Sequence, residues 1–292
     1  MLRIPKPRAA GDIASDGVRI HYQVFGHGRR AILLLPTWSI VHSDFWRQQV
    51  PHLATRYTVV SFDGRGNGAS ERPGAASAYA ERQFADDALA VLDEVGIERA
   101  AIVSASQGGC WGLILAATRP GRVPAAVFIA PDLPFGPPHA EQAPAYAAFD
   151  EPQARYEGWS KWNRHYWRED WPGFLEFFFS KCFTEPDSER EIEHFVGMGL
   201  ETTPEVIIAT VEAPALTEAD AKRFAASLAC PALVIHGDHD EVTPLPCGQE
   251  LARLAGADLA VLPGSGHEPH CRSPADVNRL LDEFLARHYA AD

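Results

Sequence analysis

Short apolar runs alternate with longer amphipathic stretches along the chain. This alternation predicts β-strands joined by crossover helices, as in an α/β protein built on a mostly parallel sheet flanked by helices. The expected strands are residues 18–24, 31–35, 57–62, 100–104, 125–129, 232–236 and 259–262. The expected helices, in which apolar residues recur at helical spacing, are residues 45–54, 79–95, 108–118 and 274–288.

The pattern changes between about Pro131 and Pro214, where strand-like runs disappear and aromatic residues become frequent. We expect a helical cap inserted into one α/β core, and the predicted parts are core residues 1–131, cap residues 132–215 and core residues 216–292. A small cap must bury its own aromatic side chains, so most of them are expected in its core. The candidates for the wall of an apolar substrate pocket are Trp159, Trp162 and Tyr166, which fall near helical spacing.

Composition narrows the class of protein. The chain has 292 residues, of which 46% are hydrophobic, so it can bury a large core. Its formal net charge is -13 and it has no Lys/Arg-rich run, which argues against nucleic acid as a partner. The five cysteines are odd in number and scattered, without a CxxC pair, so neither a disulfide framework nor a zinc ribbon is expected.

The same features predict a cytoplasmic protein. The basic residues near the N-terminus are not followed by an apolar stretch, so no secretory signal is expected. Apolar runs such as residues 31–36 are too short to span a bilayer. We therefore expect a monomer or homodimer that acts on a small apolar molecule, without a membrane or nucleic-acid partner.

A candidate nucleophile lies where an apolar strand runs into a turn of small residues and then a helix. Residues 101–109 read AIVSASQGG, which has G-x-S-x-G spacing with Ser104 in place of the first glycine. Small residues are needed there because the turn is strained and the strand and helix pack closely. Ser106 would stand at a helix N-terminus, where the amide of Gln107 would donate to an oxyanion. The alternative is that Ser106 only caps the helix.

A serine nucleophile needs a base, and the base needs a group that orients it. Residues 231–240 read PALVIHGDHD, a buried strand followed by a turn that contains Asp238 and Asp240. Residues 262–267 read LPGSGH, the end of a second strand followed by a loop that ends in His267. Both segments lie beyond the carboxyl ends of expected strands, where open α/β sheets place their sites. The alternative for His267 is a solvated loop histidine.

Two histidine-containing segments could also indicate a metal site. They are residues 236–240, which include His236 and His239, and residues 267–271. On an extended segment, successive side chains point to opposite sides, so these groups would not converge on one ion. We expect no metal and no cofactor, and we expect His236 to be a strand-end residue and His239 a surface residue, neither with a catalytic role.

These segments together resemble the α/β-hydrolase fold family over nearly the whole chain. Residues 63–70, DGRGNGAS, are similar to the family's D-x-R-G-x-G-x-S turn, which is structural. The resemblance implies an α/β-hydrolase fold in which Ser106 is the nucleophile, His267 the base and Asp240 the acid. Gly237 aligns with the glycine of the family's G-x-x-D pattern, and this assigns the acid to Asp240 rather than to the aspartate two residues earlier.

The loop after residues 31–35 departs from the family's pattern. Members of the family usually have His-Gly there, and the amide of the next residue is the second oxyanion donor. Pro36 and Thr37 replace that pair here, and Trp38 takes the donor position. Proline lacks an N–H group and Thr37 lacks glycine's freedom at positive φ, so we expect a stiffer loop that still forms an oxyanion hole. Trp38 is also a candidate for the pocket wall.

The resemblance implies a serine hydrolase that cleaves a carboxylic ester, lactone or thioester of an apolar, medium-sized substrate through an acyl-enzyme. A carbon–carbon bond hydrolase, or an acyl-transfer or cyclisation enzyme of small-molecule biosynthesis, would use the same residues. A third alternative is a non-catalytic ligand-binding protein, which the altered loop at residues 36–38 would favour. Serine at position 106 argues against haloalkane dehalogenase and epoxide hydrolase chemistry, which needs a carboxylate nucleophile.

Overall fold

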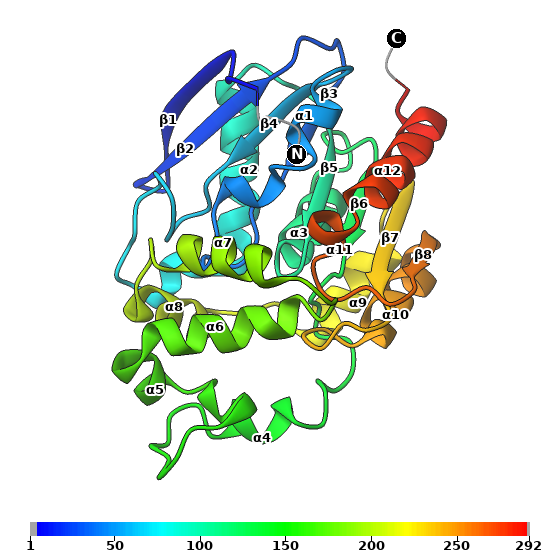
Figure 1. The fold of residues 1–292 in the computed structure, drawn as a ribbon. Coiled ribbons are helices and arrows are strands. Elements are labelled where there is room, and N and C mark those ends of the chain that lie inside the picture. Colours follow the sequence, from blue (N-terminus) through cyan, green and yellow to red (C-terminus); the bar gives the residue numbers. More distant parts are fainter. Residues whose placement is uncertain (1–4, 291–292) are drawn as a thin grey trace.

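The computed structural model describes residues 5–290, and its centre is an eight-stranded sheet in the order β1-β2-β4-β3-β5-β6-β7-β8 (Figure 1). β1 pairs antiparallel with β2 and β2 with β4, and all the other neighbours are parallel. The strands are β1 (Ala9–Ser15), β2 (Val18–Phe25), β3 (Ala31–Leu34), β4 (Thr58–Phe62), β5 (Ala100–Ala105), β6 (Ala126–Ile129), β7 (Ala232–Gly237) and β8 (Asp258–Leu262). The predicted mostly parallel α/β sheet is therefore confirmed.

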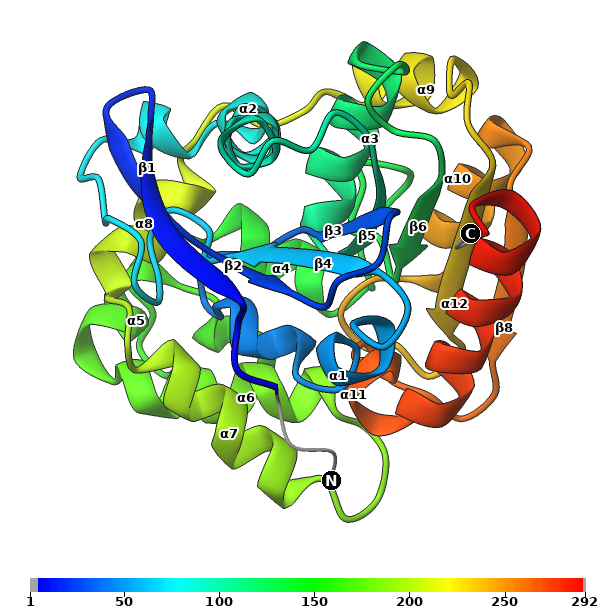
Figure 2. The ribbon, with the colours of Figure 1, turned by 90° about the horizontal axis from the view of Figure 1, so that it is seen from above.

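Helices cover both faces of this sheet. The helices are α1 (Val50–Leu53), α2 (Glu81–Glu94), α3 (Gly108–Thr118), α4 (Gln142–Ala147), α5 (Arg164–Glu169), α6 (Trp171–Cys182), α7 (Glu189–Gly199), α8 (Pro204–Val211), α9 (Glu218–Ala226), α10 (Leu245–Ala255), α11 (Pro269–Arg272) and α12 (Pro274–His288). Three 3₁₀ turns are η1 (Ser43–Trp46), η2 (Ala76–Tyr79) and η3 (Gly158–Lys161). Figure 2 shows α2, α3 and α9 on one face of the sheet and α1, α11 and α12 on the other.

The central strands are apolar along their whole length because both of their faces are covered. Every residue of β3, β4, β5 and β6 is buried, as expected for parallel strands between two helix layers. α2 buries the apolar face that includes Phe84, Ala88 and Val91, which matches its predicted amphipathic spacing. No helix among residues 5–290 is long and apolar enough to cross a lipid bilayer.

Three local predictions differ from the structure. The expected helix 45–54 is two short turns, η1 and α1, because Pro51 cannot donate a helical hydrogen bond and is tolerated only in the first turn of α1. The expected helix 79–95 begins later, at Glu81, since Ala80 is extended with ψ of 141°. β1 was not predicted; its sequence AAGDIAS has little β-branched character, and it is held as an edge strand by pairing with β2.

The long connection between β6 and β7 contains η3 and the helices α4 to α8, all within residues 132–215, which we call the helical segment. These helices lie at the end of the sheet where the parallel strands terminate (Figure 1). Aromatic side chains form the interior of the segment, where Trp167 packs on Phe174 with ring centroids 4.6 Å apart and on Trp162 at 5.3 Å. α9 lies outside the segment and contacts α3 and α10 of the sheet's helical layer.

A buried ion pair connects the D-x-R-G turn to α2. The Arg65 guanidinium donates two hydrogen bonds to the Asp87 carboxylate, at 2.8 and 2.7 Å, and another to the carbonyl oxygen of Ala78 at 2.6 Å. Both charged side chains are fully buried. Burial raises the pKa of Asp87 even against the charge of Arg65, so desolvation of the pair is only partly offset.

Removing one member of this pair is expected to destabilise the protein strongly. Asp87→Asn leaves the Arg65 charge buried without a counter-charge and should lower the free energy of unfolding by about 3–5 kcal/mol in urea titrations. The matched control is Asp93→Asn, which removes a half-exposed pair with Arg122 and should cost less than about 1 kcal/mol. An equal loss of unfolding free energy in the two variants would contradict the expectation that the buried pair contributes more than the exposed one.

Candidate active site

The turn between β5 and α3 holds Ser106 in a strained backbone conformation. Its φ is +50°, in the left-handed region that non-glycine residues rarely adopt. The amide of Ser106 donates to the carbonyl oxygen of Ile129 on β6, which fixes the turn against the sheet. Gly108 allows the helix to approach the neighbouring loop, since a Cβ atom there would lie 2.4 Å from the carbonyl oxygen of Pro36.

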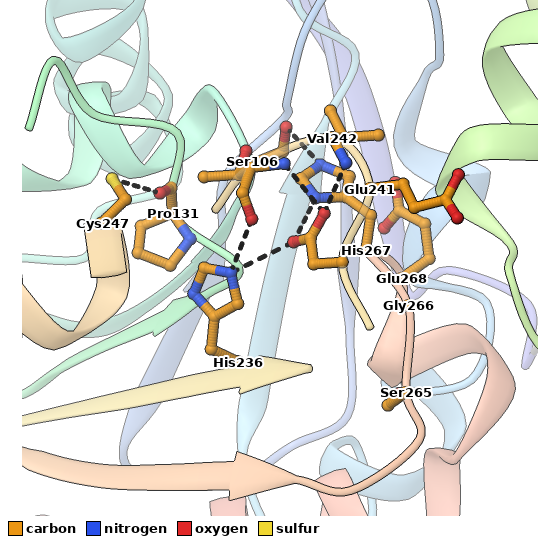
Figure 3. Close-up of polar contacts among 12 residues, drawn as sticks. Ser106, Pro131, His236, Glu241, Val242, Cys247, Ser265, Gly266, His267 and Glu268 are labelled. Carbon is orange, nitrogen blue, oxygen red and sulfur yellow. Dashed lines mark hydrogen bonds and ion pairs between the residues drawn. The ribbon is translucent and has the colours of Figure 1, made fainter. Parts of the chain in front are cut away.

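Ser106, His267 and Asp240 form a continuous chain of hydrogen bonds (Figure 3). His267 Nε2 lies 2.9 Å from Ser106 Oγ, and His267 Nδ1 lies 2.8 Å from Asp240 Oδ2. The histidine and the aspartate are buried, whereas the serine is partly exposed. Ser106 follows β5, Asp240 follows β7 and His267 follows β8. The common direction of these parallel strands brings the three residues to one edge of the sheet.

Asp240 is held by more donors than the sequence indicated. Its Oδ1 accepts from the amides of Val242 and Thr243, both at 2.8 Å. Its Oδ2 lies 3.1 Å from Nε2 of the buried His236. Burial alone would raise the pKa of Asp240, but the charge of His267 and the hydrogen bonds from both histidines hold that pKa well below its ordinary value.

His236 is the penultimate residue of β7, in agreement with its expected place at a strand end, and its side chain lies against the Asp240 carboxylate. It positions the carboxylate that contacts His267, and the four-residue spacing between His236 and Asp240 was the only sequence signal for this contact. Asp238 is exposed and accepts a hydrogen bond from the amide of Gly264 at 2.6 Å, so it does not reach the histidine. No cluster of three or more His, Cys, Asp or Glu side chains in residues 5–290 could hold a metal ion.

The two candidate oxyanion donors lie on adjacent strands. Trp38 follows β3 and Gln107 follows β5, and the chain order reverses between these neighbours, which is where open α/β sheets bind ligands. Neither backbone amide donates a hydrogen bond to any described residue. The ring of Trp38 is anchored by donation from its Nε1 to Thr210 Oγ1 at 2.7 Å. With Pro36 and Thr37 in this loop, the amides of Trp38 and Gln107 are both without an acceptor among the described residues, and both residues line the same cavity as Ser106.

A cavity of about 540 Å³ is lined by Ser106 and by both candidate donor residues. Its wall is largely aromatic and apolar, and the aromatic residues are Trp38, Tyr79, Phe135, Tyr146, Phe149, Trp162 and Phe178. Two carboxylic acids, Glu81 and Asp132, also line it. Sequence reasoning singled out neither acid, because one is on α2 and the other follows β6, and neither belongs to a motif.

The expected pocket wall is correct for only part of the aromatic cluster. Trp38 and Trp162 line the cavity and stack on each other with ring centroids 5.2 Å apart. Trp159 and Tyr166 do not line it: Trp159 packs edge-on against Phe177, and the Tyr166 hydroxyl donates to Asp170 within the helical segment. Helical spacing placed these residues on neighbouring turns, but η3 and α5 are separate short elements.

The helical segment also supports the loop that carries His267. The amide of His267 donates to the carbonyl oxygen of Cys182 at the end of α6, at 3.0 Å. Glu185 Oε1 accepts from the amide of Gly266 at 2.9 Å and from Ser265 Oγ at 3.2 Å. Residues from two distant parts of the chain therefore hold one side of the site.

A further titratable group, Glu268, follows His267 directly in the sequence. Burial opposes protonation of His267, but the charge and hydrogen bond of Asp240 outweigh it and raise the pKa of the imidazole above its ordinary value. Burial raises the pKa of the neighbouring Glu268 to about 8, although the charge of His267 acts against this shift. Glu268 is therefore a buried neutral acid near pH 7.

This protonated acid predicts a pH-dependent stability difference. The Glu268 pKa is about 8 in the folded chain against an ordinary value of 4.5. The contribution of this group to the free energy of unfolding is therefore complete below pH 4.5 and disappears as pH rises to 8. Relative to Glu268→Gln, the wild type should lose up to about 1.4 kcal/mol of unfolding free energy per pH unit in this window. Urea titrations at several pH values measure the difference. Parallel curves would refute the shift, and exposed Glu169→Gln is the control.

Residues 30–274 match the family described as alpha/beta hydrolase fold, and the chain belongs to this family. It is 27% identical over 279 residues to 3-oxoadipate enol-lactonase 2 of Acinetobacter baylyi, covering 94% of this chain and 96% of that protein. It is 27% identical to serine hydrolase BPHL of Homo sapiens, covering 94% and 85%. The crystal structure of the enol-lactonase from Burkholderia xenovorans LB400 has the same fold, with a TM-score of 0.77, 24% identity and coverage of 94% and 99%. These similarities support a hydrolase.

Proposed function

We propose that this protein is a serine hydrolase that cleaves a carboxylic ester or lactone through an acyl-enzyme. The observation that supports it is the hydrogen-bonded series Ser106–His267–Asp240 at the edge of a cavity of about 540 Å³. The similarity to an enol-lactonase and to a serine hydrolase agrees with ester-type chemistry. We also propose that residues 132–215 act as the cap that closes this cavity.

The proposed reaction starts with attack of Ser106 Oγ on the substrate carbonyl carbon, while His267 Nε2 takes the hydroxyl proton. The amides of Trp38 and Gln107 donate to the oxyanion of the tetrahedral intermediate. His267 then gives the proton to the leaving alcohol oxygen, and the acyl group remains on Ser106. A water molecule, deprotonated by His267, attacks the acyl-enzyme and releases the acid.

Asp240 and His236 serve this reaction by holding the imidazole. The aspartate accepts the Nδ1 proton of His267, so Nε2 is free to accept the serine proton, and the negative charge stabilises the imidazolium that forms. His236 and the two backbone amides fix the carboxylate in the orientation that this hydrogen bond requires.

Covalent labelling tests the proposal. A fluorophosphonate probe should modify the wild type on the peptide that contains Ser106, as seen by mass spectrometry, because an activated serine displaces fluoride from phosphorus. Ser106→Ala should remain unlabelled while its circular dichroism spectrum is unchanged. Equal labelling of the two proteins, or none in the wild type together with no turnover of p-nitrophenyl esters, would refute a serine hydrolase.

A further inference from the structure

The acids in the cavity differ in what holds them. Glu81 is buried, and both of its carboxylate oxygens are hydrogen-bonded within the protein. Its Oε1 accepts from Gln107 Nε2 at 3.2 Å, and its Oε2 accepts from Trp111 Nε1. The Asp132 side-chain oxygens receive no hydrogen bond and no ion pair from any residue among 5–290. The side chain of Asp132 is exposed, and it lines the cavity.

Backbone contacts fix Asp132 beside the nucleophile. Its amide donates to the carbonyl oxygen of Ser106 at 3.0 Å, and its own carbonyl oxygen accepts from Cys110 Sγ at 3.2 Å. The backbone of Asp132 is thus hydrogen-bonded to the turn that carries the Ser106 hydroxyl, and its carboxylate has no partner among the described residues. Desolvation by the surrounding protein raises the pKa of Asp132, and the charge of His267 counteracts part of that shift.

The rest of the wall fits a cation. No Lys, Arg or His side chain is among the described residues that line the cavity, so no cationic side chain of its wall pairs with Asp132. The aromatic rings nearby include Trp38, Trp162 and Tyr146, and the last two pack with centroids 5.2 Å apart. Aromatic faces attract ammonium groups, most strongly where water is excluded.

We infer that Asp132 makes this site selective for esters or lactones that contain a positively charged amine or quaternary ammonium group, bound between the carboxylate and the aromatic wall. The selectivity in hydrolysis rests on the proposed hydrolase function. The binding of a cation at Asp132 does not, and it can be tested by itself. It refines the expected apolar substrate to one that is apolar over most of its surface and cationic near the reacting carbonyl.

Matched ester pairs measure the selectivity. On the alcohol side, choline phenylacetate is compared with 3,3-dimethylbutyl phenylacetate, in which carbon replaces nitrogen at equal shape. On the acyl side, phenylalanine methyl ester is compared with methyl 3-phenylpropanoate. We expect Asp132→Asn to reduce the preference in kcat/KM for the cationic member of at least one pair by about 10- to 100-fold, the usual contribution of one contact to a charged group.

The ratio within a pair is used because it cancels any effect of Asp132 on the shared nucleophile. The matched control is Asp86→Asn on the exposed face of α2, which changes the net charge equally and should retain the wild-type ratio. Equal ratios in wild type and Asp132→Asn for both pairs, with ester turnover intact, would overturn the selectivity and leave the hydrolase function standing.

Equilibrium binding tests the cation site independently of the proposed hydrolase function. Calorimetry with Ser106→Ala should show binding of phenethylammonium that is at least about 10-fold tighter than binding of phenethyl alcohol, and the difference should disappear in Ser106→Ala/Asp132→Asn. This result would support the cation site even if the wild type failed both the labelling and the turnover tests. Equal binding of the two compounds by Ser106→Ala would overturn the inference whatever the outcome of those tests.

Discussion

Ser106→Ala should lower kcat for ester hydrolysis by about 10⁶, the loss seen when a triad serine is removed from a hydrolase whose triad acts as a unit. The reason is geometric: Ser106 Oγ is the only atom in the proposed mechanism that forms the covalent bond to the acyl group. The residual rate would come from the cavity and from the proposed oxyanion donors, the amides of Trp38 and Gln107, which would still bind and polarise the carbonyl.

Kinetics on a p-nitrophenyl ester, with protein purified in parallel, measure this loss. Ser104→Ala is the matched control, because Ser104 lies two residues earlier on β5 and only donates to the carbonyl oxygen of Val127. The control should retain activity within about one order of magnitude, since the loss of one neutral hydrogen bond costs about 1 kcal/mol. A Ser106→Ala protein that keeps a substantial fraction of the wild-type rate would rule out the acyl-enzyme.

Asp240→Asn is expected to have the second largest effect, a fall in kcat of about 10⁴. An asparagine amide that donates to His267 Nδ1 would force the imidazole proton onto Nε2, which then cannot accept from Ser106. Loss of the negative charge should also lower the pKa of His267, since Asp240 is what raises it. The small remaining activity should therefore rise with pH at a lower pH than in the wild type.

The pH profile of kcat/KM from about pH 5 to about pH 10 tests both parts, because it reports the pKa of the essential base in the free enzyme. Asp238→Asn makes the same chemical change two residues away, on an exposed side chain whose Oδ1 can still accept from Gly264. Comparable losses in Asp238→Asn, or an unshifted pH profile in Asp240→Asn, would be inconsistent with the assigned acid.

Local sequence signals predicted those features of the fold and site that depend on short segments. Ser106 could be singled out because a strand, a small-residue turn and a helix are contiguous in the chain. His267 and an aspartate at 238 or 240 could be proposed with it because parallel strands end at a common edge, so loops distant in sequence converge there. The choice of Asp240 rested on the family resemblance. The predicted core strands were also correct, since burial on both faces makes them continuous apolar runs.

Features that depend on tertiary packing were not predictable in this way. Nothing local shows that His236 turns toward Asp240, or that Asp132 faces a cavity without a partner. The edge strand β1 has weak intrinsic preference and exists because β2 offers it a complete ladder. Trp159 and Tyr166 were assigned to the pocket by helical spacing, which does not apply across the separate elements η3 and α5.

The contacts of Cys182 and Glu185 with the His267 loop limit how this enzyme can be re-engineered. A chimera that receives residues 132–215 from a relative would lose the anchors at Cys182 and Glu185 unless the transplanted segment restores them. Exchange of α4 alone would change the part of the cavity wall that Gln142 and Tyr146 form and leave those anchors in place. The natural crossover point for such grafts therefore lies before the end of α6, because the cavity wall upstream of it can be changed without removing the contacts that hold the His267 loop.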